Sequence, residues 1–289
     1  GKLNVTGNFA HAISSHGNLT IDGGEYQVSS VKDGLHAKST LTANSGDINI
    51  TKSYEGLEGK DKVVINGGNI KIVSSDDAIN AGTDLTINNG IIYANCEGDG
   101  FDSNGSMTIN GGTSTIYASN RGDGALDIGE RNAAFTINGG TVFGVGGDMT
   151  VAVSDTSKQY SMWINGTFAK DSSIKIGDIE TKKIIKDGSV VFYSSSKIKA
   201  DAKYEVKVGD TSLSTISMTA KNVTLGESKN QMGGGKGGTK GGTKGGMNGG
   251  GFRKNNDSSF TAPDDRKDDR PDDSSDGTNS TVEDENKSL

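Results

Sequence analysis

The chain has 289 residues and a net charge of −7, which argues against a nucleic-acid backbone as its main partner. It contains 44 glycines and only 2 prolines, and Ser, Thr, Asn and Asp are abundant. This composition favours short strands joined by tight turns over helices. No apolar run reaches the roughly 18 residues needed to span a membrane. A single cysteine, Cys96, excludes an intrachain disulfide.

A motif of the form apolar-Thr-apolar-Asn-Gly-Gly recurs every 22 residues in the first half of the chain. Its copies begin at Leu19, Leu41, Val63, Leu85 and Met107, and a further copy follows after 28 residues at Phe135. A fixed period of this length with strand-like alternation predicts stacked coils. Each repeat holds three pairs of alternating apolar residues, which predicts three short strands and three turns per coil. We therefore expect an all-β fold, a right-handed parallel β-helix with 22-residue coils.

One turn of each repeat has a recurrent composition. A glycine ends the motif in every copy, where we expect a positive φ. The Asn or Asp two residues earlier is expected to form a ladder of side chains that stabilises the turn. The ladder residues are Asp22, Asn44, Asn66, Asn88, Asn110 and Asn138, and the glycines are Gly24, Gly46, Gly68, Gly90, Gly112 and Gly140.

The 22-residue period holds in only part of the sequence, and this divides the chain into three segments. Residues 1–149 are predicted to form the coils. Residues 150–228 are predicted to form a final coil and a C-terminal β-hairpin cap, with Trp163 in its core and the hairpin built from residues 190–193 and 204–206. Residues 229–289 are Gly-rich and then acidic, and we expect them to lack fixed structure.

Two further positions of the repeat carry polar side chains, which stacking would place in two columns beside the third strand of each coil. The pairs are His11/Ser14, Asp33/His36, Glu55/Glu58, Asp77/Asn80, Asp99/Asp102 and Asp123/Asp127. Carboxylates one coil apart repel by about 1 kcal/mol even in water. A cation between coils would remove this repulsion, and hard oxygen ligands indicate Ca²⁺.

The small residues Gly56, Ala78, Gly100 and Gly124, each next to an acid, are expected to let the ion approach the backbone. A solvated acidic edge with raised pKa values is the alternative. Zn²⁺ is not expected, because His11 and His36 stand a coil apart without a third soft ligand.

The runs that contain these acids resemble bacterial carbohydrate-binding domain-containing proteins with a pectate-lyase-like β-helix. They span residues 33–37, 53–59, 75–81, 98–105 and 122–127. The resemblance implies a secreted, calcium-containing protein that binds cellulose- or pectin-type polysaccharide without cleaving it. His36 and the pair His11/Ser14 depart from the pattern. The calcium ligands that the resemblance implies are Glu55, Glu58, Asp77, Asn80, Asp99, Asp102, Asp123 and Asp127.

Three functions remain open from the sequence. A polysaccharide binder would use outward aromatic rings, for which Tyr54, Tyr93 and Tyr117 are the candidates. A calcium-dependent pectate-type lyase would need a base, for which Arg121 and Arg131 are the candidates. A surface spacer or adhesin would need neither. We expect the binder, as an extracellular or cell-surface monomer with no catalytic residues.

Overall fold

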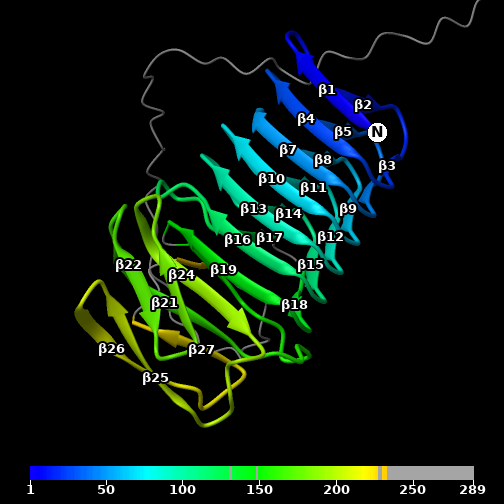
Figure 1. Ribbon diagram of the computed structural model, residues 1–289. Helices are drawn as coiled ribbons and strands as arrows, with labels where there is room; N and C mark the ends of the chain where they lie inside the picture. The colour runs from blue at the N-terminus through cyan, green and yellow to red at the C-terminus, as the bar shows by residue number, and fades with distance from the viewer. Residues whose placement is uncertain (130–131, 148, 227–229, 233–289) are drawn as a thin grey trace, which may run out of the picture. The chain divides into compact units, whose positions relative to one another are not determined.

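A computed structural model describes residues 1–129, 132–147, 149–226 and 230–232 of the chain. Three parallel sheets run along the coils, and each coil contributes one strand to each sheet (Figure 1). This arrangement confirms the right-handed parallel β-helix. No described residue belongs to a helix, so none of the described chain provides a helix that would cross a membrane.

The longest sheet contains the six-residue strands of the coils and continues into the cap. Its strands in spatial order are β1 (Lys2–Gly7), β4 (Glu25–Ser30), β7 (Asp47–Lys52), β10 (Asn69–Ser74), β13 (Ile91–Cys96), β16 (Thr113–Tyr117), β19 (Thr141–Gly146), β24 (Gly188–Ser195), β21 (Ser161–Phe168) and β27 (Asn222–Leu225). We call it the long sheet.

Two shorter sheets complete the coils. The first, called here the acidic-edge sheet, contains β2 (Ile13–Ser15), β5 (Leu35–Ala37), β8 (Leu57–Gly59), β11 (Ile79–Ala81), β14 (Phe101–Ser103) and β17 (Leu126–Ile128). The second contains β3 (Leu19–Ile21), β6 (Leu41–Ala43), β9 (Lys62–Ile65), β12 (Asp84–Ile87), β15 (Ser106–Ile109) and β18 (Phe135–Ile137).

Strand pairing follows the 22-residue period. Ile79 pairs with Leu57 on one side and with Phe101 on the other, so equivalent residues of successive coils lie above one another. The alternating apolar residues point inward and are almost completely buried, as at Leu85 and Ile87. This burial along the axis supplies the hydrophobic stabilisation that no single coil has alone.

The predicted turn is also confirmed. The glycines that end the motif have φ values between 82° at Gly112 and 114° at Gly90, a region that favours glycine. The amide of each ladder asparagine donates to the side chain one coil earlier, for example Asn88 Nδ2 to Asn66 Oδ1 at 2.7 Å. The ladder runs without a break from Asp22 to Asn138.

The cap differs from the expected hairpin. Residues 190–193 lie in β24, which runs antiparallel between β19 and β21, whereas residues 204–206 lie in a separate antiparallel sheet. Within that sheet the hairpin is formed by adjacent strands β25 and β26. The four-stranded sheet contains β23 (Glu180–Lys183), β22 (Ser173–Ile176), β25 (Lys203–Val208) and β26 (Thr211–Ser217). Long strands that continue the long sheet cover its last edge better than one hairpin.

Aromatic residues close the open end of the coils. Phe192 of β24 lies 4.5 Å from Trp163 and 5.7 Å from Phe135 between ring centroids. Trp163 is 2 % exposed, which confirms its core position. Three residues of the segment expected to lack structure form β28 (Asn230–Met232), which pairs with β20 (Met149–Val151). Residues 233–289 lie outside the described residues.

Candidate metal-binding columns and glycan-facing surface

The acidic-edge sheet brings the predicted ligands into columns. Asn80 of β11 pairs with Glu58 of β8 and with Asp102 of β14. Asp102 in turn pairs with Asp127 of β17, so one column continues through these coils. The second column lies in the turns that precede the strands.

Backbone amides orient the carboxylates of the second column. Asp77 Oδ1 accepts the backbone N–H of Asp99 at 2.7 Å, and Asp99 Oδ1 accepts that of Gly124 at 2.5 Å. Each carboxylate is therefore fixed by the next coil through one of its two oxygens. Asp123 is half-buried in the following turn.

These acids are half-buried, and their pKa values respond to that environment. Burial, together with the negative charge of Asp76, raises the pKa of Asp77 to about 7. Burial and the charge of Asp77 raise the pKa of Asp99 to about 8, although the Gly124 amide acts in the opposite direction. Burial and the charge of Asp127 raise the pKa of Asp102 to about 6. The ionised form of each acid is thus poorly stabilised by the protein alone.

A tighter acidic group lies nearer the amino terminus. Carboxylate oxygens of Asp33, Glu55 and Glu58 lie within 4.8 Å of one another, and all three residues are buried. Burial and the charges of Glu58 and Asp33 raise the pKa of Glu55 to about 9, despite a hydrogen bond from Asn80 Nδ2 at 2.9 Å. Two of the eight predicted ligands, Glu55 and Glu58, therefore belong to a compact group. Asp33 was missing from the predicted ligand set although it occupies the same repeat position as Glu55.

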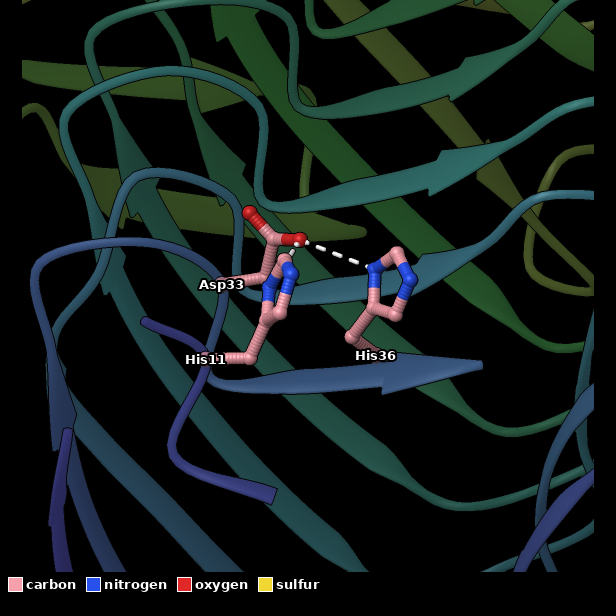
Figure 2. A group of neighbouring side chains, drawn as sticks. All are labelled: His11, Asp33 and His36. Atoms are coloured by element: carbon pink, nitrogen blue, oxygen red, sulfur yellow. Dashed lines mark hydrogen bonds and ion pairs between the residues drawn. The ribbon is translucent and has the colours of Figure 1, made fainter. Parts of the chain in front are cut away.

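The histidines of the first coils join this group (Figure 2). Nδ1 of His11 lies 2.8 Å from Asp33 Oδ2, and Nδ1 of His36 lies 3.1 Å from the same oxygen. Burial alone would raise the pKa of Asp33, but its hydrogen bonds with the two histidines hold it well below the usual range. For His36, contacts with Asp33 and Glu58 outweigh the opposing effect of burial and raise the pKa to about 9.

The glycines beside the acids have a packing role that the sequence did not show. A Cβ on Gly100 would lie 2.1 Å from Ile116 Cγ2, and a Cβ on Gly56 would lie 2.5 Å from Ile72 Cγ2. Both glycines therefore face the apolar core inside the coils, against the inner side of the long sheet. Contact with these isoleucines gives both glycines a packing reason, and the approach of an ion to the backbone stays a prediction.

The outer face of the long sheet offers a shallow open depression of about 260 Å³. Tyr93 lines it with the exposed Ile91, and the polar side chains are Asp47, Asn49, Asn69 and Lys71. Lys71 pairs with Asn49 and with Tyr93 across successive strands, so a row of different polar and aromatic groups crosses the coils.

The three predicted tyrosines have different surroundings. Tyr93 is half-buried and faces the depression just described. Tyr54 is half-buried beside the acidic columns, where a hydrogen bond with Asp76 and burial raise its pKa. Tyr117 is only 4 % exposed, because the cap covers it, and its hydroxyl donates to the backbone oxygen of Lys183 at 2.7 Å. Tyr117 is therefore a packing residue and no platform for a sugar ring.

The two candidate bases and the single cysteine are the remaining residues singled out from the sequence. Arg121 is exposed in the turn after β16, and among the described residues its guanidinium has no ion pair with the acidic columns. Arg131 lies outside the described residues. Cys96 is completely buried, its thiol donates to the backbone oxygen of Asp99 at 3.2 Å, and burial raises its pKa. These surroundings agree with a small core residue.

The family of carbohydrate-binding domain-containing proteins matches residues 1–142 and 52–219, which together span the coils and most of the cap. The chain belongs to this family. Neither the curated proteins nor the solved structures that were searched include a match to the chain.

Proposed function

We propose that the protein is an extracellular, non-catalytic polysaccharide-binding protein that uses Ca²⁺ in its acidic columns. Its ligands would be cellulose- or pectin-type glycans. Membership of the carbohydrate-binding family supports the sugar partner. The observation that carries the calcium part is the stack of half-buried carboxylates at Asp77, Asp99 and Asp102, none of which forms an ion pair with a Lys or Arg within the described ranges.

Calcium suits these columns for a chemical reason. The ligands available are carboxylate and amide oxygens, and Ca²⁺ accepts about six to eight oxygens at roughly 2.3–2.6 Å in flexible geometry. Backbone amides hold one oxygen each of Asp77 and Asp99, which leaves the other oxygen of each for an ion. Asn80, Asp102 and Asp127 would add oxygens from the neighbouring column.

The glycan would use two features of the surface. A pectin-type chain carries carboxylates, and a calcium ion held by the acidic columns has open positions that such a carboxylate would fill. The depression around Tyr93 would hold sugar rings, because an aromatic face stacks on their apolar side while Asn49, Asn69 and Lys71 offer hydrogen bonds. Successive strands place these different groups about 4.8 Å apart.

The other two functions are weaker alternatives. A lyase needs a base and a basic cluster that holds a polyanionic substrate. Among the residues that the structure describes, Arg121 forms no ion pair with the acids and has no basic neighbour in its turn. A spacer or adhesin would explain the repeat but not the half-buried acids Asp77, Asp99 and Asp102 without counter-ions. Both are distinguished from the binder by experiment.

A pull-down assay with a parallel activity measurement tests the proposal. Full-length protein is incubated with insoluble cellulose or with pectin, with Ca²⁺ or with excess chelator, and unsaturated product is followed by ultraviolet absorbance. We expect protein in the pellets, reduced by chelator for pectin, and no rise in absorbance. A steady rise would replace the binder with a lyase, and absence from both pellets would favour the spacer.

Calcium itself is tested by thermal stability. Chelator-treated protein is titrated with CaCl₂, and the melting temperature should rise because the ion binds the folded state. The double variant Asp77→Asn and Asp99→Asn should lose most of that rise. The double variant Asp22→Asn and Asp47→Asn is the matched control, since it removes the same two charges from exposed positions outside the columns. An unchanged response in the double variant would reject calcium at this place.

A further inference from the structure

The first coils contain a side-chain group whose chemistry differs from the rest of the acidic columns. His11 precedes β2, Asp33 precedes β5, and His36 lies on β5. The two imidazole rings stack with centroids 4.0 Å apart and planes 20° apart. Both Nδ1 atoms approach the same Asp33 oxygen, as Figure 2 shows. A nitrogen atom of each ring and one Asp33 oxygen lie within 4.8 Å of one another.

From this geometry we infer that His11, Asp33 and His36, together with Glu58, bind one transition-metal ion of the Zn²⁺ class. The inference does not rest on the proposed function, because none of these four residues is among the calcium ligands argued above. Glu58 belongs only to the larger set that the sequence resemblance implies. It also reverses the sequence-based expectation. A separation of one coil along the chain places His11 and His36 side by side in space.

The distances suit a metal. Two ligand atoms that bind the same tetrahedral Zn²⁺ at about 2.0–2.1 Å lie about 3.3 Å apart. The two nitrogen–oxygen distances to Asp33 are 2.8 and 3.1 Å, close to this separation. Because an imidazole binds a metal in the plane of its ring, one of the two stacked rings must turn out of the stack to admit the ion. Glu58 Oε2 lies 2.5 Å from His36 Nδ1 and is placed to be the fourth ligand.

One buried atom without a hydrogen-bond partner supports a missing ligand. Glu55 Oε2 is buried and without a partner, and Glu55 as a whole is 8 % exposed. Most buried polar atoms in proteins are satisfied, so an unsatisfied oxygen beside Asp33 and Glu58 requires an explanation. A bound ion with a water molecule would supply it.

Charge and ligand type select the class of metal. With neutral imidazoles, the carboxylates of Asp33, Glu55 and Glu58 and the ammonium of Lys60, which pairs with Glu58, carry a net charge of −2 that a divalent ion would balance. Imidazole nitrogen suits Zn²⁺, Ni²⁺, Cu²⁺ and Co²⁺, whereas Ca²⁺ and Mg²⁺ prefer oxygen. The histidines thus change the preference of the column from hard ions to borderline ions. Binding would release the protons now shared between the imidazoles and the carboxylates.

Direct metal titration tests the site. Chelator-treated full-length protein is titrated with ZnCl₂ by calorimetry, and with CoCl₂ while the visible absorption of tetrahedral Co²⁺ is followed. We expect one Co²⁺ per chain in tetrahedral geometry, displaced by Zn²⁺ but not by a large excess of CaCl₂. Absence of Zn²⁺ binding, or a Co²⁺ spectrum of octahedral type, would overturn the inference.

Variants assign the ligands. His11→Ala and His36→Gln should each weaken Zn²⁺ binding at least tenfold and abolish the tetrahedral spectrum. His16→Ala is the matched control, because His16 is the remaining histidine of the chain and is exposed. Circular dichroism before titration shows whether each variant is folded. Equal Zn²⁺ affinity in folded His11→Ala, His36→Gln and wild-type protein would contradict the assignment, and the wild-type spectrum decides the matter if a variant fails to fold.

Discussion

The backbone N–H of Asp99 donates to Oδ1 of Asp77 at 2.7 Å, which couples a carboxylate in one coil to the backbone of the next. The contact fixes the direction of Asp77 while leaving its charge uncompensated by any cationic side chain in the described structure. The backbone N–H of Gly124 makes the same contact with Asp99 Oδ1 one coil later, so the acids form an oriented stack. The stability of metal-free protein should therefore depend on their protonation.

Asp99→Asn tests this dependence on pH. The pKa of Asp99 in the fold is about 8, above its ordinary value of 3.8. At pH values between these two pKa values, the folded state therefore binds more protons than the unfolded state. This contribution to stability is present below about pH 4 and is lost as the pH rises towards about 8. In excess chelator, the variant should be as stable as wild type at acid pH and more stable at about pH 8. Thermal melts across this range measure the difference.

Calcium should reverse that order. With the ion bound, wild-type protein regains stability at alkaline pH by mass action, whereas the variant has lost a ligand and responds less. The asparagine keeps an oxygen for the Gly124 amide, so the change removes charge with little change of shape. If chelator-treated wild type and variant have the same pH profile, the raised pKa of Asp99 is wrong.

Gly100→Ala tests the packing reason for the glycines. Its Cβ would lie 2.1 Å from Ile116 Cγ2 and 2.4 Å from the backbone oxygen of Ala125, so the coil must shift. Overpacking of a dense core costs about 1–3 kcal/mol. Chemical denaturation should show a loss of this size. A variant as stable as wild type would reopen the role of ion access at this position.

Replacement of a ladder asparagine should destabilise the protein by an amount that depends on its position in the ladder. Asn88 donates to Asn66 and accepts from Asn110, whereas Asn138, the last member of the ladder described above, donates to Asn110. One such hydrogen bond contributes about 0.5–1.5 kcal/mol. Asn88→Ala should therefore destabilise the protein about twice as much as Asn138→Ala. Urea denaturation of both variants measures the ratio, and equal losses would show that the ladder contributes little.

The repeat made much of the fold predictable from sequence. Because equivalent residues stack, the period alone placed Leu57 beside Ile79, Asn66 beside Asn88 and Asn80 beside Asp102. The same reasoning predicted which apolar positions are buried. In a stacked repeat each coil contacts only its neighbours, so these contacts can be predicted from the period alone.

Contacts outside the registry were not predictable in this way. Tyr117 is covered by a cap that begins far along the chain, and its partner Lys183 belongs to no repeat. Gly100 is constrained by Ile116 on another sheet. The sequence places His11 and His36 one coil apart in different columns, and the structure brings their rings into contact. Stacking of His11 on His36 follows from the 22-residue period together with the three-residue offset of the two columns.

Tyr93 and Tyr117 provide a paired test of whether the depression on the long sheet binds glycan. Their rings lie 6.0 Å apart between centroids, but only Tyr93 lines the open depression. Loss of an aromatic stacking partner costs about 0.5–1.5 kcal/mol, so Tyr93→Ala should weaken glycan binding about two- to tenfold. Tyr117→Phe removes the hydrogen bond to Lys183 and should lower stability by about 1 kcal/mol without changing glycan affinity. Binding isotherms on cellulose and pectin, with thermal melts of both variants, separate the two effects. Undiminished binding by Tyr93→Ala would move the sugar to another face, and the acidic-edge sheet would become the surface to test next.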